Sequence, residues 1–447
     1  MGTRKQQERQ EGFWVATTNL PRSAGHPFYE RLNGLLEEAG FDAFVEERCR
    51  KFYAPRMGRP SLAPGMYFRL LLMGYFEGLD SERGMAWRAA DSLGLRRFLR
   101  IGLEEAPPDH STISRTRRLI AVETHREVFT WVLGVLARKG LLQGKTLGVD
   151  ATTLEANAAL KSIVRRDGGE SYSEFLTKLA QESGIETPTR ADLARLDRKR
   201  KKKGSNRDWV NPHDPEARIT KMKDGRTHLA HKAEHAVDLE TGAVVAVTVQ
   251  GADQGDTTTV KGTFIEAAEQ MEVVGKEAAA DAKMNAKGLE EVVADKGYHS
   301  GAMVEDLREI GVRSYLSEPQ RGRRHWPGKR GEHGKQLLRR RGELLERTFA
   351  HVYDTGGMRR THLRGHRNIL KRLLLHVAAF NLSLVLRREI GVGTPRGLQD
   401  LQNRLFFCCC SVWVALESLW ESSGRLPATS ADRFPMLPPP GQSQTAA

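Results

Sequence analysis

Cysteines are few in this chain of 447 residues, and their positions exclude two classes of site. The four cysteines are Cys49 and the adjacent Cys408, Cys409 and Cys410. This spacing matches neither a zinc site nor a disulfide framework. We therefore expect reduced thiols, as in a cytoplasmic protein.

Apolar runs of membrane-spanning length are also missing. The apolar stretch Phe406–Trp420 contains Glu417 and is too short to cross a bilayer, so we expect a buried helix there. The N-terminal residues are polar with no apolar stretch behind them, which predicts no signal peptide. No membrane partner is expected.

Acidic residues are outnumbered, with 56 Asp and Glu against 70 Lys and Arg, which gives a net charge of +14. Such a basic chain favours a polyanionic partner, because each neutralised phosphate releases condensed counterions. Hydrophobic residues at 39% and charged residues at 28% are ordinary for a soluble protein. The length allows about two or three domains.

Residues from about 26 to 140 have the pattern of a helical region. Pro107 and Pro108 end one element, and Asp109 or Ser111 can cap the helix that follows. A short turn before a helix with basic first turns is typical of a DNA recognition helix. A capped surface helix with a solvated basic face is the alternative. The basic residues concerned are Arg115, Arg117 and Arg118.

The character of the sequence changes at Lys145, where a short apolar strand is predicted to end in Asp150. Residues from about 160 to 230 are then polar and charged, with a basic run at 198–203. Such a run cannot pack in a core, so we expect an exposed and partly flexible insertion. It either follows a DNA backbone or is simply solvated.

Regular structure is predicted again after this insertion. Two β-rich runs around Gly242 indicate a hairpin. A helix, a strand ending in Asp295, a short helix closed by Gly311 and a further strand follow. A long helix then carries Glu346 at the edge of its apolar stripe, and a last helix covers about 367–389.

Three carboxylates are notable in this order of elements: Asp150 and Asp295 each lie at a predicted strand end, and Glu346 lies on the long helix that follows. Adjacent parallel strands would put Asp150 and Asp295 at one edge of a sheet, and a helix across that edge would bring Glu346 to them. Three like charges repel one another unless cations neutralise them. Mg²⁺ or Mn²⁺ prefers such an all-oxygen site, and two ions about 3.5–4 Å apart suit in-line displacement at phosphorus. Singly, Asp150 can instead cap a helix, and Asp295 can be a turn residue.

Basic residues flank Glu346 on both sides. Glu332 is the only acid among many Lys and Arg residues within 321–341, and no acid lies between Thr355 and Arg388. Such clusters suit a phosphate backbone, which they position without reading its sequence.

Three blocks carry a family resemblance: GVDATTLEANAA around Asp150, ADKGYHS around Asp295, and LLERTFAHVYDTGGMRRTHLRGHRNILKRLL around Glu346. They closely resemble the catalytic blocks of DDE transposases from bacterial insertion sequences. The chain is most similar to the insertion-sequence-five supergroup and, within it, to the insertion-sequence-eleven-eighty-two type. The resemblance runs from about residue 26 to 390, and HPFYERLNGLLEEAGFDAFVEE begins the part that is similar to that branch's N-terminal domain.

The resemblance implies a two-part α+β or α/β fold. A helical DNA-binding domain, 26–140, would precede a ribonuclease H-like catalytic domain, 141–390, with a mixed sheet flanked by helices. The polar insertion would follow the first strand. We expect 1–25 to be a flexible N-terminus and 391–447 to be a largely disordered tail.

The resemblance also implies roles for single residues. Asp150, Asp295 and Glu346 would be the catalytic residues and the ligands of two Mg²⁺ or Mn²⁺ ions, and Tyr298 would lie beside the DNA. Glu343 is a close rival of Glu346, but the motif Glu-Arg-x-Phe matches the family at Glu346.

The chain departs from the family pattern at two positions. Members often have an Arg four residues before the glutamate and a Lys seven after it, where this chain has Gly342 and Tyr353. Neighbouring basic residues are expected to make the DNA contacts instead. These are Arg340 or Arg341 in the first role, Arg359 or Arg360 in the second, and Arg364 and Lys371 beside them.

The resemblance implies that the chain is a transposase. Water would hydrolyse a strand at the end of a mobile element, and the freed 3′-hydroxyl would attack target DNA at the same site. The partners would be double-stranded DNA, as terminal inverted repeats and target, and a second copy of the chain on DNA at the bacterial nucleoid. The alternatives are an inactive DNA-binding remnant or regulator and a ribonuclease H-like nuclease that cuts without joining.

Overall fold

The computed structural model describes residues 25–54, 61–200, 204–222, 225–277, 284–316, 331–400 and 413. The chain divides into two compact units, Met1–Pro395 and Arg396–Ala447, and the helices and strands from Pro27 to Ile390 all belong to the first. Apart from Trp413, the helix expected at Phe406–Trp420 lies outside the described residues, as do the expected flexible N-terminus up to residue 24 and the tail beyond 413.

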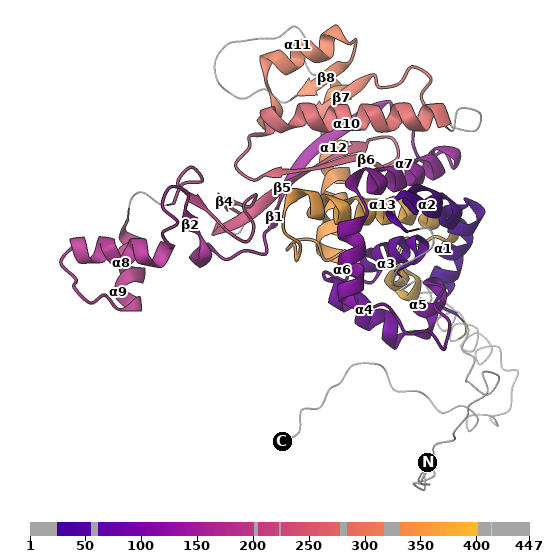
Figure 1. The fold of residues 1–447 in the computed structure, drawn as a ribbon. Helices are drawn as coiled ribbons and strands as arrows, with labels where there is room; N and C mark the ends of the chain where they lie inside the picture. The colour runs from indigo at the N-terminus through magenta and orange to yellow at the C-terminus, as the bar shows by residue number, and fades with distance from the viewer. Residues whose placement is uncertain are drawn as a thin grey trace, which may run out of the picture. The chain divides into compact units, whose positions relative to one another are not determined.

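Helices make up the N-terminal part of the first unit, as the sequence predicts (Figure 1). They are α1 (Pro27–Glu38), α2 (Phe41–Cys49), η2 (Arg50–Phe52), α3 (Pro64–Phe76), α4 (Glu82–Asp91), α5 (Leu93–Phe98), α6 (His110–Leu119) and α7 (Val122–Arg138). The predicted cap of α6 is confirmed, because Asp109 Oδ1 accepts a hydrogen bond from the backbone N–H of Ser111 at 2.8 Å.

A mixed sheet follows. Its strands are β1 (Thr146–Glu155), β4 (Arg218–Lys221), β5 (Thr227–Asp238), β6 (Val244–Gly251), β7 (Glu291–Ala294) and β8 (Arg313–Leu316). The order is β4-β5-β1-β7-β8, and β6 also pairs with β5. β5 is antiparallel to β1, β4 and β6, whereas β1, β7 and β8 run parallel. The hairpin predicted around Gly242 is confirmed as the β5–β6 turn, where Gly242 has a φ of 80° that favours glycine.

The predicted alternation of strands and helices is also confirmed. The later helices are α10 (Asp256–Glu277), η4 (Lys296–Tyr298), α11 (Gly301–Glu309), α12 (Glu332–Phe349), the π-helical turn η5 (Ala350–Thr355) and α13 (His366–Ile390). α13 is apolar around most of its circumference and packs against α3, α7 and β6. The stretch His366–Asp400 has the length and composition to cross a membrane, but 89% of its most apolar window is buried inside the protein, as in a core helix.

α10 and α12 cover opposite faces of the sheet. Glu234 and His235 are consecutive in β5, so their side chains point to opposite faces. Thr259 and Thr263 of α10 donate hydrogen bonds to Glu234, whereas the ring of Phe349 of α12 lies 5.1 Å from that of His235. The sheet therefore has one face covered by α10 and another covered by α12.

The polar segment after β1 forms small elements of its own. They are η3 (Leu160–Ser162), β2 (Val164–Arg165), α8 (Tyr172–Glu182), α9 (Arg190–Lys199) and β3 (Trp209–Val210). A small core of Ala156, Ile163, Trp209, Ala217 and Leu229 lies in this region, and Leu160 of η3 and Tyr172 and Phe175 of α8 pack against it. In Figure 1, α8 and α9 lie at the end of β4 and β5 that is remote from α1–α7. The basic residues 201–203 within this segment lie outside the described residues.

Candidate active site

Asp150 lies inside β1, not at its end. The predicted end of the strand at Asp150 is therefore wrong, because β5 continues to pair with β1 as far as Glu155. On the other side of β1, pairing with β7 stops at Gly148, opposite Val293. No described strand pairs with β1 at Asp150 on this side, and the Asp150 side chain is 32% exposed.

Asp295 lies directly after the adjacent strand β7, which ends at Ala294, and it is level with Asp150 in the register of the two strands. It follows Val293 by two residues, as Asp150 follows Gly148, and Val293 and Gly148 are register partners. Both aspartates share the face of those partners, since side chains alternate along a strand. That face belongs to α12, where Leu337 packs against Val293. Asp295 Oδ1 also accepts a hydrogen bond from Lys296 N at 2.7 Å, which is the turn role considered as its alternative.

Glu346 lies on α12 and is exposed, next to the buried Leu345. Its carboxylate forms no hydrogen bond or ion pair with the described residues, and it makes no contact with either aspartate there. Across the described part of the chain, no three His, Cys, Asp or Glu residues are grouped closely enough to hold a metal ion. Asp150 and Asp295 are therefore level with each other on the sheet face that α12 covers, and α12 carries Glu346. Among the described residues, the three carboxylates do not form a ligand cluster.

Arg341 of α12 is a cation among the described residues that contacts Asp150. Its Nη2 lies 2.7 Å from Asp150 Oδ2, and its Nε donates a hydrogen bond to Val149 O at 3.0 Å. The side chain is buried. Gly148 leaves room for it, since a Cβ at Gly148 would lie only 3.1 Å from Arg341 Cγ. The neighbouring Arg340 is exposed and donates to Glu240 O at 2.9 Å.

A second cluster lies beneath the aspartates, on the α10 face. Glu234 accepts hydrogen bonds from the Tyr298 hydroxyl at 3.1 Å and from two threonines of α10. Lys232 Nζ lies 3.7 Å from Glu234 and donates to Asp256 Oδ1 at 2.6 Å. Burial raises the pKa of Glu234, and burial followed by the charges of Glu234, Asp256 and Asp150 raises the pKa of Tyr298.

Two adjoining cavities lie beside the loop that precedes α13, and we call them together the arginine groove. One has a volume of about 530 Å³ and the other about 580 Å³. Asn157 and Arg364 line both. Arg360 lines the first, and Arg118 of α6 lines the second. The groove thus brings together exposed basic residues from distant parts of the sequence.

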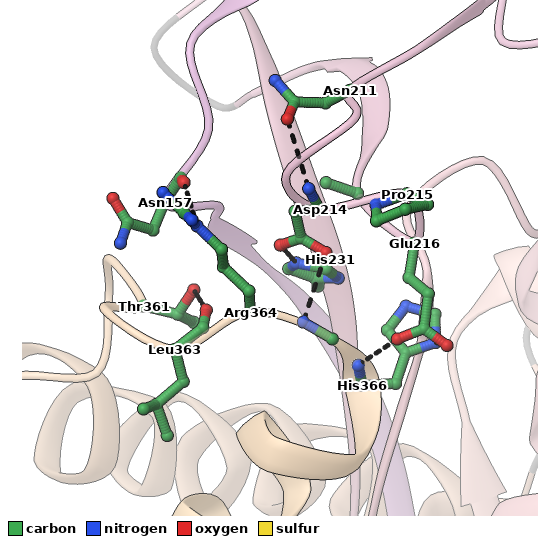
Figure 2. A network of polar contacts seen from close by, with 12 residues as sticks. Asn157, Asn211, Asp214, Pro215, Glu216, His231, Thr361, Leu363, Arg364 and His366 are labelled. Atoms are coloured by element: carbon green, nitrogen blue, oxygen red, sulfur yellow. Dashed lines mark hydrogen bonds and ion pairs between the residues drawn. The ribbon is translucent and has the colours of Figure 1, made fainter. Parts of the chain in front are cut away.

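Figure 2 shows the polar contacts that join the insertion to the start of α13, beside the arginine groove. Asp214 accepts a hydrogen bond from Gly365 N at 3.2 Å, and Glu216 accepts one from His366 N. Asp214 Oδ2 also lies 3.1 Å from Nε2 of the buried His231. Because α13 has no side-chain cap of its own, these carboxylates satisfy N–H groups at its start. Arg364 lies two residues before that start, and its Nε donates a hydrogen bond to Asn157 O at 3.4 Å.

Comparison with known families gives two matches, one over the helical N-terminal part and one over the part that contains the sheet. A family model described as a transposase DDE domain matches residues 149–382, which include all three predicted carboxylates. A second model, described as a transposase domain (DUF772), matches residues 19–119. The chain belongs to the DDE transposases. No curated protein matches this transposase.

The residues predicted to contact DNA in this transposase differ in exposure. Arg115, Arg118, Arg340, Arg360 and Arg364 are exposed. Arg359 is half-buried and donates to Asp354 and Thr152. Arg117, Arg341, Lys371 and Tyr298 are buried. Arg117 pairs with Glu82, and Lys371 donates to the Arg117 carbonyl at 2.8 Å, so both side chains face protein groups.

Sequence reasoning missed the cluster around Glu234. The available signal was the presence of Lys232 and Glu234 inside the run 228–237, whose other residues are apolar or His. Charged residues are seldom buried unless they are paired, so such residues within a buried strand point to a polar cluster. Asp256 carried no such signal, because an acid in the first turn of a helix is common.

Proposed function

We propose that this DDE transposase cleaves DNA at the ends of an insertion sequence and joins the freed 3′-hydroxyl to target DNA. Asp150, Asp295 and Glu346 are the proposed catalytic carboxylates. We assign the chain to the insertion-sequence-five supergroup, of the insertion-sequence-eleven-eighty-two type. The main support is that Asp150 lies on β1 and Asp295 directly follows the parallel strand β7 at the same level, on the sheet face covered by the helix that carries Glu346.

The proposed catalytic domain, 141–390, is ribonuclease H-like. The support is its sheet, in which an antiparallel group of β6, β5 and β1 continues into the parallel strands β7 and β8. The helical part, 26–140, is the proposed DNA-binding domain. Its capped helix α6 presents the exposed Arg115 and Arg118.

The proposed cofactor is Mg²⁺ or Mn²⁺, as two ions. Carboxylate oxygens are the ligands that these ions prefer, so the chemistry of the donors fits. The arrangement of the described residues does not fit two metal ions, because Arg341 forms an ion pair with Asp150 and the three carboxylates are not grouped. When bound, the ions supply charge neutralisation at the reacting phosphate.

Double-stranded DNA is the proposed partner, bound by two copies of the chain. The arginine groove supports a DNA path on one side of the carboxylates, since Arg360 and Arg364 can neutralise phosphates there. The exposed Arg340 and Lys335 of α12 support contacts on the other side. Such contacts position DNA, whereas reading of the terminal repeat is assigned to α6.

The test uses the full chain, a labelled fragment carrying both ends of its element, and a supercoiled target plasmid. With Mg²⁺, we expect 3′-end cleavage followed by joining, and neither in EDTA. Asp150→Asn is expected to abolish both steps and to keep DNA binding. Unimpaired strand transfer by this variant would refute the assignment. Cleavage without joining by the unaltered chain would indicate a nuclease, and metal-independent binding without cleavage would indicate a DNA-binding remnant.

A further inference from the structure

Arg341 contacts Asp150, the proposed metal ligand, through an ion pair. Its guanidinium lies against Asp150 Oδ2, and Asp150 Oδ1 accepts a hydrogen bond from Ala151 N at 2.8 Å. Both oxygens of the carboxylate are therefore engaged by the chain itself. A divalent cation that approaches Asp150 meets a fixed positive charge at contact distance, which opposes its binding.

The local structure favours this ion pair in the absence of DNA. Arg341 is buried, and a buried cation needs an anion and hydrogen-bond acceptors. Asp150 supplies the anion, and the carbonyl of Val149 supplies an acceptor. Gly148 provides space for the side chain on the strand itself. Among the described residues, Asp150 is the only carboxylate with which Arg341 forms an ion pair.

A DNA phosphate is a suitable competing partner for Arg341. The guanidinium binds phosphate and carboxylate with the same planar pair of donors. Exposed basic residues on the same helix, Lys335 and Arg340, attract the phosphate backbone to its neighbourhood. Departure of the guanidinium to a phosphate would remove the charge of Arg341 from the partly exposed carboxylate of Asp150.

We propose that Arg341 is a positioning residue that occupies Asp150 until bound DNA draws it away, so that tight metal binding depends on DNA. This inference rests on the proposed role of Asp150 as a metal ligand. It accounts for carboxylates that suit a metal by chemistry but are not grouped around one. It also limits metal-dependent cleavage to the DNA-bound enzyme.

The test measures Mn²⁺ binding to the full chain by calorimetry in the absence of DNA. Arg341→Met removes the charge and fills the space, and we expect it to tighten Mn²⁺ binding by about tenfold or more. Arg340→Met, the matched control on the same helix, is expected to leave the affinity unchanged. Unchanged or weaker Mn²⁺ binding by folded Arg341→Met would overturn the proposal.

Two further variants keep the test decisive if Arg341→Met does not fold. Circular dichroism and thermal melting establish whether each variant is folded. If Arg341→Met unfolds, Arg341→Gln replaces it, since the amide can still donate to Val149, and the same tightening is expected. Arg341→Lys retains the charge and is expected to bind Mn²⁺ as weakly as the unaltered chain. Tightening by Arg341→Lys equal to that by the neutral variants would contradict a charge-based role.

Linkage provides a readout that is independent of cleavage. If DNA releases Asp150 from Arg341, a divalent ion must raise the affinity for DNA by the same factor as DNA raises the affinity for the ion. Anisotropy of labelled duplex DNA, with and without Ca²⁺ as the oxygen-binding probe, measures this coupling. We expect the coupling to be smaller in Arg341→Met, and equal coupling in both proteins would refute the displacement of Arg341 by DNA. Failure of strand transfer, in contrast, concerns the proposed function alone.

Discussion

The Tyr298 hydroxyl donates a hydrogen bond to Glu234 Oε1 at 3.1 Å, on the sheet face opposite α12. Glu234 is the register partner of Ala151, which directly follows Asp150. Tyr298 ends η4, the short turn that Asp295 caps. The bond therefore ties the turn of one proposed catalytic aspartate to the strand beside the other.

Removal of the Tyr298 hydroxyl should disturb the position of Asp295 more than it disturbs the fold. We expect Tyr298→Phe to reduce cleavage of end DNA by about 10–100-fold, the usual effect of losing a residue that orients a metal-binding group. The lost hydrogen bond should reduce the free energy of unfolding by about 1 kcal/mol. Cleavage rates and thermal melting measure the two effects separately.

Tyr315→Phe is the matched control for this prediction. The Tyr315 hydroxyl donates to Glu291 Oε1, also at 3.1 Å, at the start of β7 and away from Asp295. A similar loss of stability is expected, but cleavage should remain near that of the unaltered chain. Equal losses of cleavage in the two variants would show that Tyr298 acts only through general stability.

A separate prediction concerns the arginine groove and its part in the strength and salt dependence of DNA binding. Arg364→Ala and Arg360→Ala should each weaken binding of duplex DNA. Each should also reduce the slope of log K against log[salt] by about 0.9, as expected for one lost phosphate contact. Anisotropy titrations over a series of KCl concentrations measure both quantities.

Arg308→Ala controls for the loss of one positive charge. Arg308 is exposed on α11, which packs beside β8 and outside the groove. Its removal is expected to change affinity slightly through net charge and to leave the salt slope unaltered. An unchanged slope in both groove variants would exclude the groove as the path of the phosphate backbone.

The order of strands and helices could be predicted from the sequence because the signals are local. The cap at Asp109, the turn at Gly242 and the apolar runs that form β1 and β7 each follow from a few neighbouring residues. The length of β1 beyond Asp150 could not be predicted in this way. Those residues mix polar and apolar side chains without a strand signal of their own, and they are extended because they pair with β5, which lies far away in the sequence.

The exposure of single basic residues could not be predicted either. Arg117 and Lys371 look alike in sequence to the exposed Arg118 and Arg364. They are buried because α6 and α13 pack together, so that Lys371 reaches the carbonyl of Arg117. The pairing of Arg341 with Asp150 likewise depends on how α12 crosses the sheet. Periodicity gives the apolar face of a helix but not the strand that this face meets.

Two glutamates of α12 provide the last prediction, since only one of them is proposed to be catalytic. Glu343 forms an ion pair with Arg347 at 2.7 Å, whereas Glu346 has no ion pair among the described residues. We expect Glu346→Gln to lower cleavage by more than about a hundredfold, since even residues that merely orient metal ligands contribute 10–100-fold. Glu343→Gln should keep cleavage near that of the unaltered chain and reduce the free energy of unfolding by about 0.3–0.5 kcal/mol, the value of an exposed helical pair. Cleavage of the same end DNA by the two variants decides which glutamate is catalytic. Both variants replace Glu by Gln at an exposed position of α12, so the general effects of the substitution should be alike. A larger loss of cleavage in Glu343→Gln would transfer the catalytic role to Glu343.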